Sequence, residues 1–235
     1  NFTSATDSHN TAIGYSAGSA VTTGQFNTLI GADSGDAITT SSYNTAIGWD
    51  SLGVNTSGEV QVALGASALR ANTTGTQNTA VGGNSMYANT EGDNNVAVGH
   101  NALDANTTAD NNTAVGKDAL GANTTGNSNV AVGKDSTKSD TQGSRSTAVG
   151  FNTLADQNFT SATDSNNTAV GYNAGGAITT GTENTLIGSL SGDAITTGVK
   201  NTALGYKAVS SVTTGDFNTG VGRTALENVT TADGN

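Results

Sequence analysis

The chain has 235 residues, of which 34% are hydrophobic, 5% are aromatic and 32 are glycine. This composition excludes a conventional thick core, yet the apolar residues recur at a fixed spacing, which indicates order rather than disorder. The formal net charge is −11 and the eight Lys and Arg residues are scattered, so the chain lacks the clustered cations that binding to nucleic acid requires.

Residues 1–9 read NFTSATDSH and return with one change as NFTSATDSN at 158–166. We therefore expect residues 1–9 to be a partial coil, the end of an earlier copy of a longer repeating unit. The chain begins with Asn rather than Met, and we expect it to be a piece of a longer protein.

From residue 10 onward the chain repeats the motif Asn-Thr-Ala-Ile/Val-Gly, whose Asn is counted below as repeat position 1. The glycine at position 5 recurs every 17 residues, except for one step of 21 residues. Its thirteen copies are Gly14, Gly31, Gly48, Gly65, Gly82, Gly99, Gly116, Gly133, Gly150, Gly171, Gly188, Gly205 and Gly222. A unit of this length is too short for a pair of helices and is typical of one coil of a β-solenoid.

We predict an all-β fold, a β-solenoid with about 17 residues per coil, in which residues 1–235 form a single repeat array of thirteen coils. The step of 21 residues extends one coil by a four-residue insertion within 155–166, which we expect to bulge from the side as a longer loop.

The first five repeat positions predict a short strand and a turn. Position 4 is always Ile, Val or Leu and position 2 is Thr or Val, so we expect both to point into the coil and the Ala at position 3 to face outward as a docking surface for other chains. Glycine at position 5 indicates a positive φ or the close approach of another backbone. Stacked Asn side chains at position 1 are expected to form a ladder of amide hydrogen bonds.

Two further positions vary together. Where position 9 is Leu or Met, as at Leu52, position 12 is Asn, as at Asn55; where position 9 is Gly, as at Gly35, position 12 is Val or Ile, as at Ile38. One large apolar group is kept from either side, which a narrow and closely packed interior would require. The pairs Val209/Val212 and Leu226/Val229 break this rule.

The stretch NTAVGKDALGANTTG at 112–126 resembles the head repeats of YadA-like trimeric autotransporter adhesins, and is similar to repeats of bacteriophage tail fibres and bacterial surface fibres. The resemblance covers essentially the whole chain. It implies a left-handed parallel β-roll, three chains packed about a common axis, and an adhesive or spacer role on the surface of a cell or a virion.

The residues do not point to an enzyme. Neither a phosphate-binding Gly-rich loop followed by Lys and Ser/Thr nor a Ser-His-Asp set is indicated, and the carboxylates fall in predicted turns. Cysteine is absent, which excludes disulfides and thiolate metal sites. We expect neither a cofactor nor a metal, and no membrane insertion, because no stretch approaches ~20 apolar residues.

Aromatic residues are the candidate contact points for a glycan, since exposed rings can stack on sugars. They follow the position 5 glycine or precede the position 1 Asn, and the candidates are Tyr15, Tyr43, Trp49, Phe151, Tyr172 and Tyr206. In the other interpretation these rings cover adjacent coils or seal a seam between chains.

The sequence thus predicts a non-enzymatic extracellular fibrous protein, a rigid adhesive or spacer rod. Its expected partners are copies of itself, as a homotrimer or filament, and a host-surface glycan or matrix protein. The alternative is an ice-binding solenoid, because Thr recurs at positions 13 and 14 in ladders. Ice-binding faces usually place two threonines one residue apart so that both point outward, whereas adjacent residues of a strand point to opposite faces. We therefore expect no thermal hysteresis.

Overall fold

The structure, a computed structural model, describes residues 7–235. Residues 1–6, and with them most of the predicted partial coil at 1–9, lie outside the described residues. As predicted, the described residues are all-β without a helix and form a parallel β-solenoid of about 12 turns with about 17 residues per coil. The chain divides into two compact units, Asn1–Asn112 and Thr113–Asn235.

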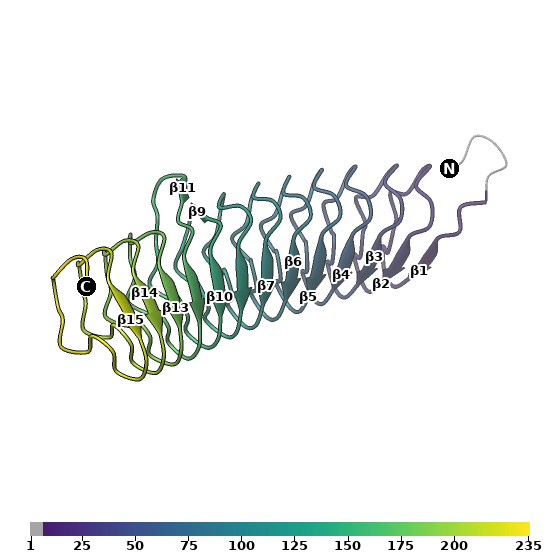
Figure 1. The fold of residues 1–235 in the computed structure, drawn as a ribbon. Coiled ribbons are helices and arrows are strands. Elements are labelled where there is room, and N and C mark those ends of the chain that lie inside the picture. The colour runs from purple at the N-terminus through teal and green to yellow at the C-terminus, as the bar shows by residue number, and fades with distance from the viewer. Residues whose placement is uncertain (1–6) are drawn as a thin grey trace. The chain divides into compact units, whose positions relative to one another are not determined.

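The first unit contains one parallel sheet with one strand per coil (Figure 1). Each strand pairs with its neighbour at an offset of one repeat, so that Thr11 lies opposite Thr28 and Ile13 opposite Ile30. The strands are β1 (Thr11–Ile13), β2 (Thr28–Ile30), β3 (Thr45–Ile47), β4 (Val62–Leu64), β5 (Thr79–Val81) and β6 (Val96–Val98).

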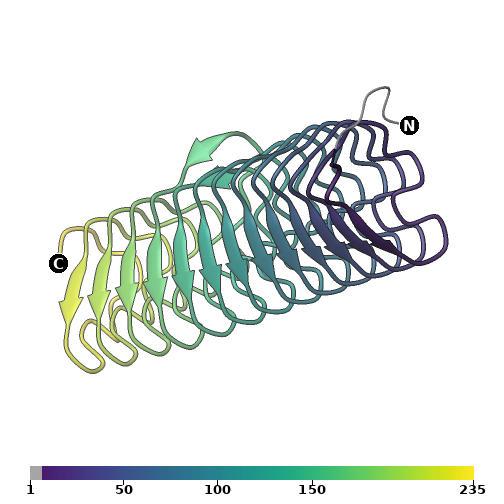
Figure 2. The ribbon, with the colours of Figure 1, turned by 90° about the vertical axis from the view of Figure 1, so that its right-hand side faces the viewer.

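The second unit repeats this arrangement and adds a small two-stranded sheet of β9 (Gly143–Ser144) and β11 (Thr163–Asp164) (Figure 2). Its main parallel sheet is made of β7 (Thr113–Val115), β8 (Val130–Val132), β10 (Thr147–Val149), β12 (Thr168–Val170), β13 (Thr185–Ile187), β14 (Thr202–Leu204) and β15 (Thr219–Val221).

The predicted direction of the strand side chains is wrong. Ala46, Ala63 and Ala80 at position 3 are fully buried inside their own coils, whereas the neighbouring Thr and Ile/Val/Leu side chains at positions 2 and 4 face outward. The interior of a coil has room for only a methyl group at position 3, because the large side chains of positions 9 and 12 fill it from the opposite side. The Ala column is therefore core and not a docking surface.

Positions 9 and 12 fill the interior as predicted, and position 3 compensates for them. Leu52 and Asn55 are both fully buried in one coil, and Ile38 is fully buried in a coil with glycine at position 9. Leu29, which replaces Ala at position 3, occupies the space left by glycines at position 9: its Cδ1 lies 2.7 Å from where a Cβ on Gly18 would be. The volume of the core is thus kept by compensating changes in side-chain size at positions 3, 9 and 12.

The pair Val209/Val212, which breaks the sequence rule, follows the same logic. Both side chains are fully buried, and the next strand carries Gly220 instead of Ala at position 3. A Cβ on Gly220 would lie 2.7 Å from Cγ2 of Val209. The missing methyl group makes room for the extra valine.

The glycine at position 5 and the Asn at position 1 have the roles that the sequence predicts. Gly82 has a φ of +134°, and a Cβ there would lie 2.6 Å from the carbonyl oxygen of Gly99 in the next coil. The backbone N–H of Asn95 donates to Oδ1 of Asn78 over 2.9 Å, and Nδ2 of Asn78 donates to the carbonyl of Gly92 over 2.7 Å. These amides supply hydrogen bonds to buried backbone groups of adjacent coils, among them the N–H of Asn95.

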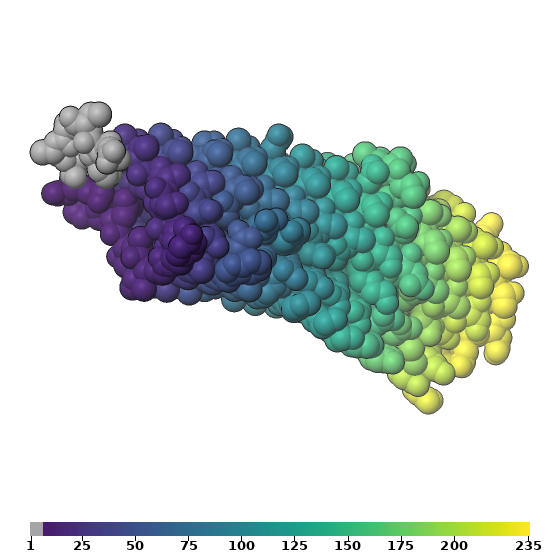
Figure 3. All heavy atoms as spheres, turned by 180° about the vertical axis from the view of Figure 1, so that it is seen from behind, coloured from purple at the N-terminus to yellow at the C-terminus, as the bar shows by residue number. Residues whose placement is uncertain are grey.

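The insertion within 155–166 bulges from the second unit as predicted and is visible as the protruding loop at β11 in Figures 1 and 2 and as a raised area in Figure 3. At its base lies Asp140, which is almost fully buried. Its carboxylate accepts hydrogen bonds from the backbone N–H groups of Gly143 at 3.1 Å and Phe159 at 3.0 Å, and from Nε2 of Gln157 at 2.6 Å. The insertion is thereby tied to the preceding coil.

Candidate functional site

The first candidate surface is the outer face of the main sheets, made by the side chains at positions 2 and 4. In the first unit its aliphatic column includes Ile13 at 59%, Ile47 at 39% and Val98 at 36% exposure. In the second unit Ile187, Leu204 and Val221 continue this pattern on strands of that unit. An exposed sheet face usually carries polar side chains, so a repeated aliphatic column is the signature of a surface that contacts something.

The aromatic residues predicted from the sequence as glycan contacts are all exposed, but they do not converge on one site. In the first unit Tyr43 stacks on Phe26, with ring centroids 5.0 Å apart, and Phe26 stacks on His9 at 4.9 Å. Tyr15 is the most exposed of the set, at 79%. Stacking along successive coils matches the second interpretation of these rings, in which they cover adjacent coils.

The second unit holds the other three predicted residues in two separate places. Phe151 and Tyr172 stack with centroids 5.7 Å apart, and Lys134 lies over the Phe151 ring at 5.2 Å. Two cations lie over the ring of Tyr206, Lys207 Nζ at 5.9 Å and Arg223 Cζ at 5.7 Å from the ring centroid. Cations already occupy positions over these rings, which leaves less free ring surface for a ligand.

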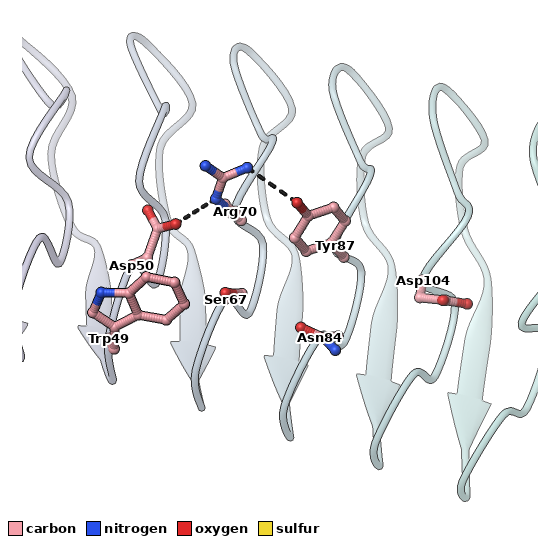
Figure 4. Close-up of a pocket in the computed structure, with 7 residues that line it drawn as sticks. All are labelled: Trp49, Asp50, Ser67, Arg70, Asn84, Tyr87 and Asp104. Carbon is pink, nitrogen blue, oxygen red and sulfur yellow. Dashed lines mark hydrogen bonds and ion pairs between the residues drawn. The ribbon is translucent and has the colours of Figure 1, made fainter.

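Trp49 differs from the other five, because it borders a hollow of about 550 Å³ on the surface of the first unit (Figure 4). Position 7 side chains lie along one side of the hollow and position 10 side chains along the other, each from successive coils. The lining residues are Trp49, Asp50, Ser67, Arg70, Asn84, Tyr87 and Asp104.

The hollow exists because the side chain at position 6 differs in size from coil to coil of the first unit. Trp49 and His100 are large, whereas the two coils between them carry Ala66 and Gly83 at this position. With one coil every ~4.8 Å, the two large rings are about 14 Å apart. A Cβ on Gly83 would lie 3.6 Å from Cδ2 of His100, an ordinary contact distance, so a methyl group fits in the space between the two rings. The indole of Trp49 is 57% exposed and points along this space.

A fixed guanidinium stands beside the indole. Nε of Arg70 is hydrogen bonded and ion paired to Asp50 Oδ2, and its Nη1 donates to the Tyr87 hydroxyl over 3.1 Å. The hydrogen bond and charge of Asp50, followed by the bond to Tyr87, hold the pKa of the Arg70 guanidinium above its already high ordinary value. Arg70 is therefore charged and held in one orientation, with further N–H groups turned toward the solvent.

The surroundings of this cation are acidic. Burial, followed by the nearby carboxylate of Asp33 and, more weakly, that of Asp50, raises the pKa of Asp36 above its ordinary value. Asp50 and Asp104 line the hollow itself. The site thus offers an open aromatic face, hydrogen-bond donors on Arg70 and acceptors on the carboxylates, with carboxylates in excess over cations.

Of the seven lining residues, only Trp49 is predicted from the sequence. The signal that points to the others is the pair of small residues, Ala66 and Gly83, between two rings at one repeat position. Arg70 and Tyr87 are also unusual at position 10, where most coils carry Gly, Ser, Asp or another small or acidic residue.

Within residues 7–235 no group of three or more His, Asp or Glu side chains is placed to hold a metal ion, and no helix is long and apolar enough to cross a membrane. Comparisons with protein families, with curated proteins and with solved structures found no match to this chain.

Proposed function

We propose that the chain is part of a non-enzymatic extracellular fibre in which copies of the chain associate through the outer face of their main sheets. The observation that supports this proposal is the exposed aliphatic column at position 4, which includes Ile47 and Val98 in the first unit and Leu204 in the second. Association would remove this column from water, a gain of ~25 cal/mol for each Å² of apolar surface buried.

Hydrogen bonds from repeated polar side chains to the backbone of adjacent coils support a structural role. The position 1 amides bond to the backbone of adjacent coils, and the position 13 hydroxyls do the same: Thr56 Oγ1 donates to the carbonyl of Thr73 over 3.1 Å. The regular coil is therefore built to be stiff, which suits a rod that spaces or presents an adhesive surface. The sequence resemblance favours a left-handed coil and a homotrimer on the surface of a cell or a virion.

Sedimentation of the purified chain tests the association. We expect a trimer that becomes a monomer in the variant Ile47→Glu/Val98→Glu, because a charge at an outward position would be buried between chains. Thr108→Glu is the matched control, since Thr108 is exposed in a turn away from the outer face, and it should leave the trimer intact. A folded wild-type chain that sediments as a monomer would refute the proposal.

The outer face also favours a second candidate function, ice binding. Thr45 and Ile47 of β3 both point outward one residue apart, and neighbouring strands repeat the arrangement in register. This is the arrangement that the threonines at positions 13 and 14 lack, and the hydroxyls at position 13 are used within the coil. Thermal hysteresis at micromolar protein, lost on Thr45→Tyr, would favour ice binding. A trimer without hysteresis would favour the fibre, because association covers the same face.

A further inference from the structure

We propose that the hollow beside Trp49 is a binding site for a neutral saccharide. The proposal deepens the adhesive part of the proposed function, since it names the class of ligand that the first unit would hold. It rests on three properties of the hollow: an open aromatic face, a fixed set of polar groups and an unfavourable field for anions.

The aromatic face is the first property. Trp49 is the only tryptophan of the chain and is 57% exposed, which is a large apolar surface to leave in water. Because Ala66 and Gly83 follow it at the same repeat position, nothing of comparable size stacks on the indole from the next two coils. The C–H face of a pyranose ring is flat and apolar, and it can cover an indole in this position while its hydroxyl groups point sideways.

The polar groups are the second property. Asp50 and Tyr87 hold the Arg70 guanidinium from two sides, so its remaining N–H groups are oriented before a ligand arrives. Tyr87 accepts a hydrogen bond from Arg70 and keeps its own proton for donation. Figure 4 shows these groups on the same side of the coils as the indole, and all of them line the same hollow.

The charge of the hollow selects against acidic sugars. Its lining includes the carboxylates of Asp50 and Asp104 but only one cation, Arg70, which is already paired with Asp50. Asp33 and Asp36 lie close to Asp50 and add to the negative field, and the chain as a whole carries a formal net charge of −11. A sialic or uronic acid would bring a further negative charge within the ~8 Å over which charges act in physiological salt.

Intrinsic tryptophan fluorescence tests the proposal directly. Trp49 is the only tryptophan of the chain and lines the hollow, so a change in this signal reports on the proposed site. The whole chain is titrated with cellotriose, maltotriose, chitotriose and lactose, and with sialyllactose and trigalacturonate as acidic probes. We expect at least one neutral saccharide to give a saturable change with a Kd on the order of 1 mM or tighter. The acidic probes should bind at least about tenfold more weakly than the best neutral one.

Three variants locate the site, with binding measured by calorimetry. Trp49→Ala should weaken binding by about tenfold or more, as expected when an aromatic anchor is removed, and Trp49→Phe should restore part of it. Gly83→Leu should weaken binding by about tenfold or more, because it places a bulky side chain next to the lining residue Asn84, and its backbone is not in the left-handed region, so the coil can accept the change. Tyr206→Ala, an exposed ring of the second unit at the same repeat position, is the control and should bind as the wild type does.

No fluorescence change with any neutral saccharide at about 10 mM, or unchanged binding by Gly83→Leu, would overturn the proposal, as would a preference for the acidic probes. These results are independent of the association through the outer face. A monomer that binds a neutral saccharide would refute the trimer alone, and a trimer that binds none would refute the saccharide site alone.

Discussion

Leu29 occupies the space that a side chain on Gly35 would need: its Cδ2 lies 2.8 Å from the position of a Cβ on that glycine. Ile38 Cδ1 lies 2.9 Å from the same point. One coil therefore fills its interior from positions 3 and 12, whereas a coil such as that of Leu52 fills it from position 9. The two solutions have similar volumes and cannot be combined.

This relationship predicts strong coupling between the three residues. Leu29→Ala should cost ~2–5 kcal/mol of stability, because it leaves a cavity. Gly35→Leu alone should also destabilise the chain, because it overfills the same space. The triple variant Leu29→Ala/Gly35→Leu/Ile38→Asn reproduces the set found at Ala46, Leu52 and Asn55, and should be more stable than the sum of its parts by more than ~1 kcal/mol. Urea unfolding of the three single variants, Ile38→Asn included, and of the triple variant measures this coupling, and additive effects would contradict the prediction.

Two adjacent glycines offer a matched test of the turn at position 5. Gly82→Ala should destabilise the chain by at least ~3 kcal/mol, since the new methyl group meets the carbonyl of Gly99 and the φ of +134° is strained for any L-residue. Gly83→Ala should be neutral or stabilise by ~0.4–1 kcal/mol, because its Cβ has room and the substitution restricts the unfolded chain. Thermal unfolding of both variants checks the contrast, and equal effects would argue against the role of the close approach.

The amide ladder predicts a graded response at Asn78. Asn78→Ala leaves the buried N–H of Asn95 without its acceptor and should cost about 1–3 kcal/mol, whereas the carbonyl of Gly92 keeps the hydrogen bond that Nδ2 of Asn89 donates over 3.1 Å. Asn78→Gln should cost less, because Gln61 fills the same position one coil earlier and its Oε1 accepts from the N–H of Asn78 at 3.1 Å. Amide exchange of Asn95, measured by NMR, should be faster in the alanine variant only.

Asp193 predicts a pH dependence of stability. Burial raises the pKa of this carboxyl above its ordinary value, and its Oδ1 has no hydrogen-bond partner. Between the unfolded pKa of about 3.9 and the raised folded value, the native state binds more protons than the unfolded state, so stability falls as the pH rises through this window. Asp193→Asn should therefore stabilise the chain at pH 7, and the gain should vanish at a pH below the unfolded pKa.

Thermal unfolding of wild type and Asp193→Asn between acidic and neutral pH measures this difference. Asp216→Asn serves as the control, because the Asp216 side chain accepts a hydrogen bond from the N–H of Val199 at 2.8 Å and its replacement should not stabilise the chain. A gain at Asp193 that stays constant with pH would show that ionisation is not its cause.

The sequence is sufficient to predict the solenoid, its period, the glycine turn and the amide ladder, because each depends on a residue type repeated at one position. The inward direction of Ala does not follow in this way, because Ile and Val at position 4 are larger and their pattern predicts that they form the core. The contrary signal lay at position 3 itself, where Leu29 and Leu186 occur only between coils with glycine at position 9, and where Gly220 follows Val209.

The hollow could not be predicted in the same way. Arg70 and Asp50 are 20 residues apart and meet only because the coil brings position 10 of one turn beside position 7 of the previous one. Sequence alone gives the period of the coil but not which positions become neighbours across it. The small residues Ala66 and Gly83 have meaning only once position 6 is known to lie on the surface.

The carboxylate of Asp140 has a consequence for how a self-similar chain finds a single alignment. Successive coils pair through nearly identical backbone bonds, so a coil shifted by one whole repeat would recover most of them. Asp140 is different, because its donors on Gln157 and Phe159 belong to the one long copy of the unit within the described residues. A shifted stack would bury this charge without those donors, at a cost far above that of a lost neutral hydrogen bond. The irregular coil thereby fixes the register in which the regular coils stack.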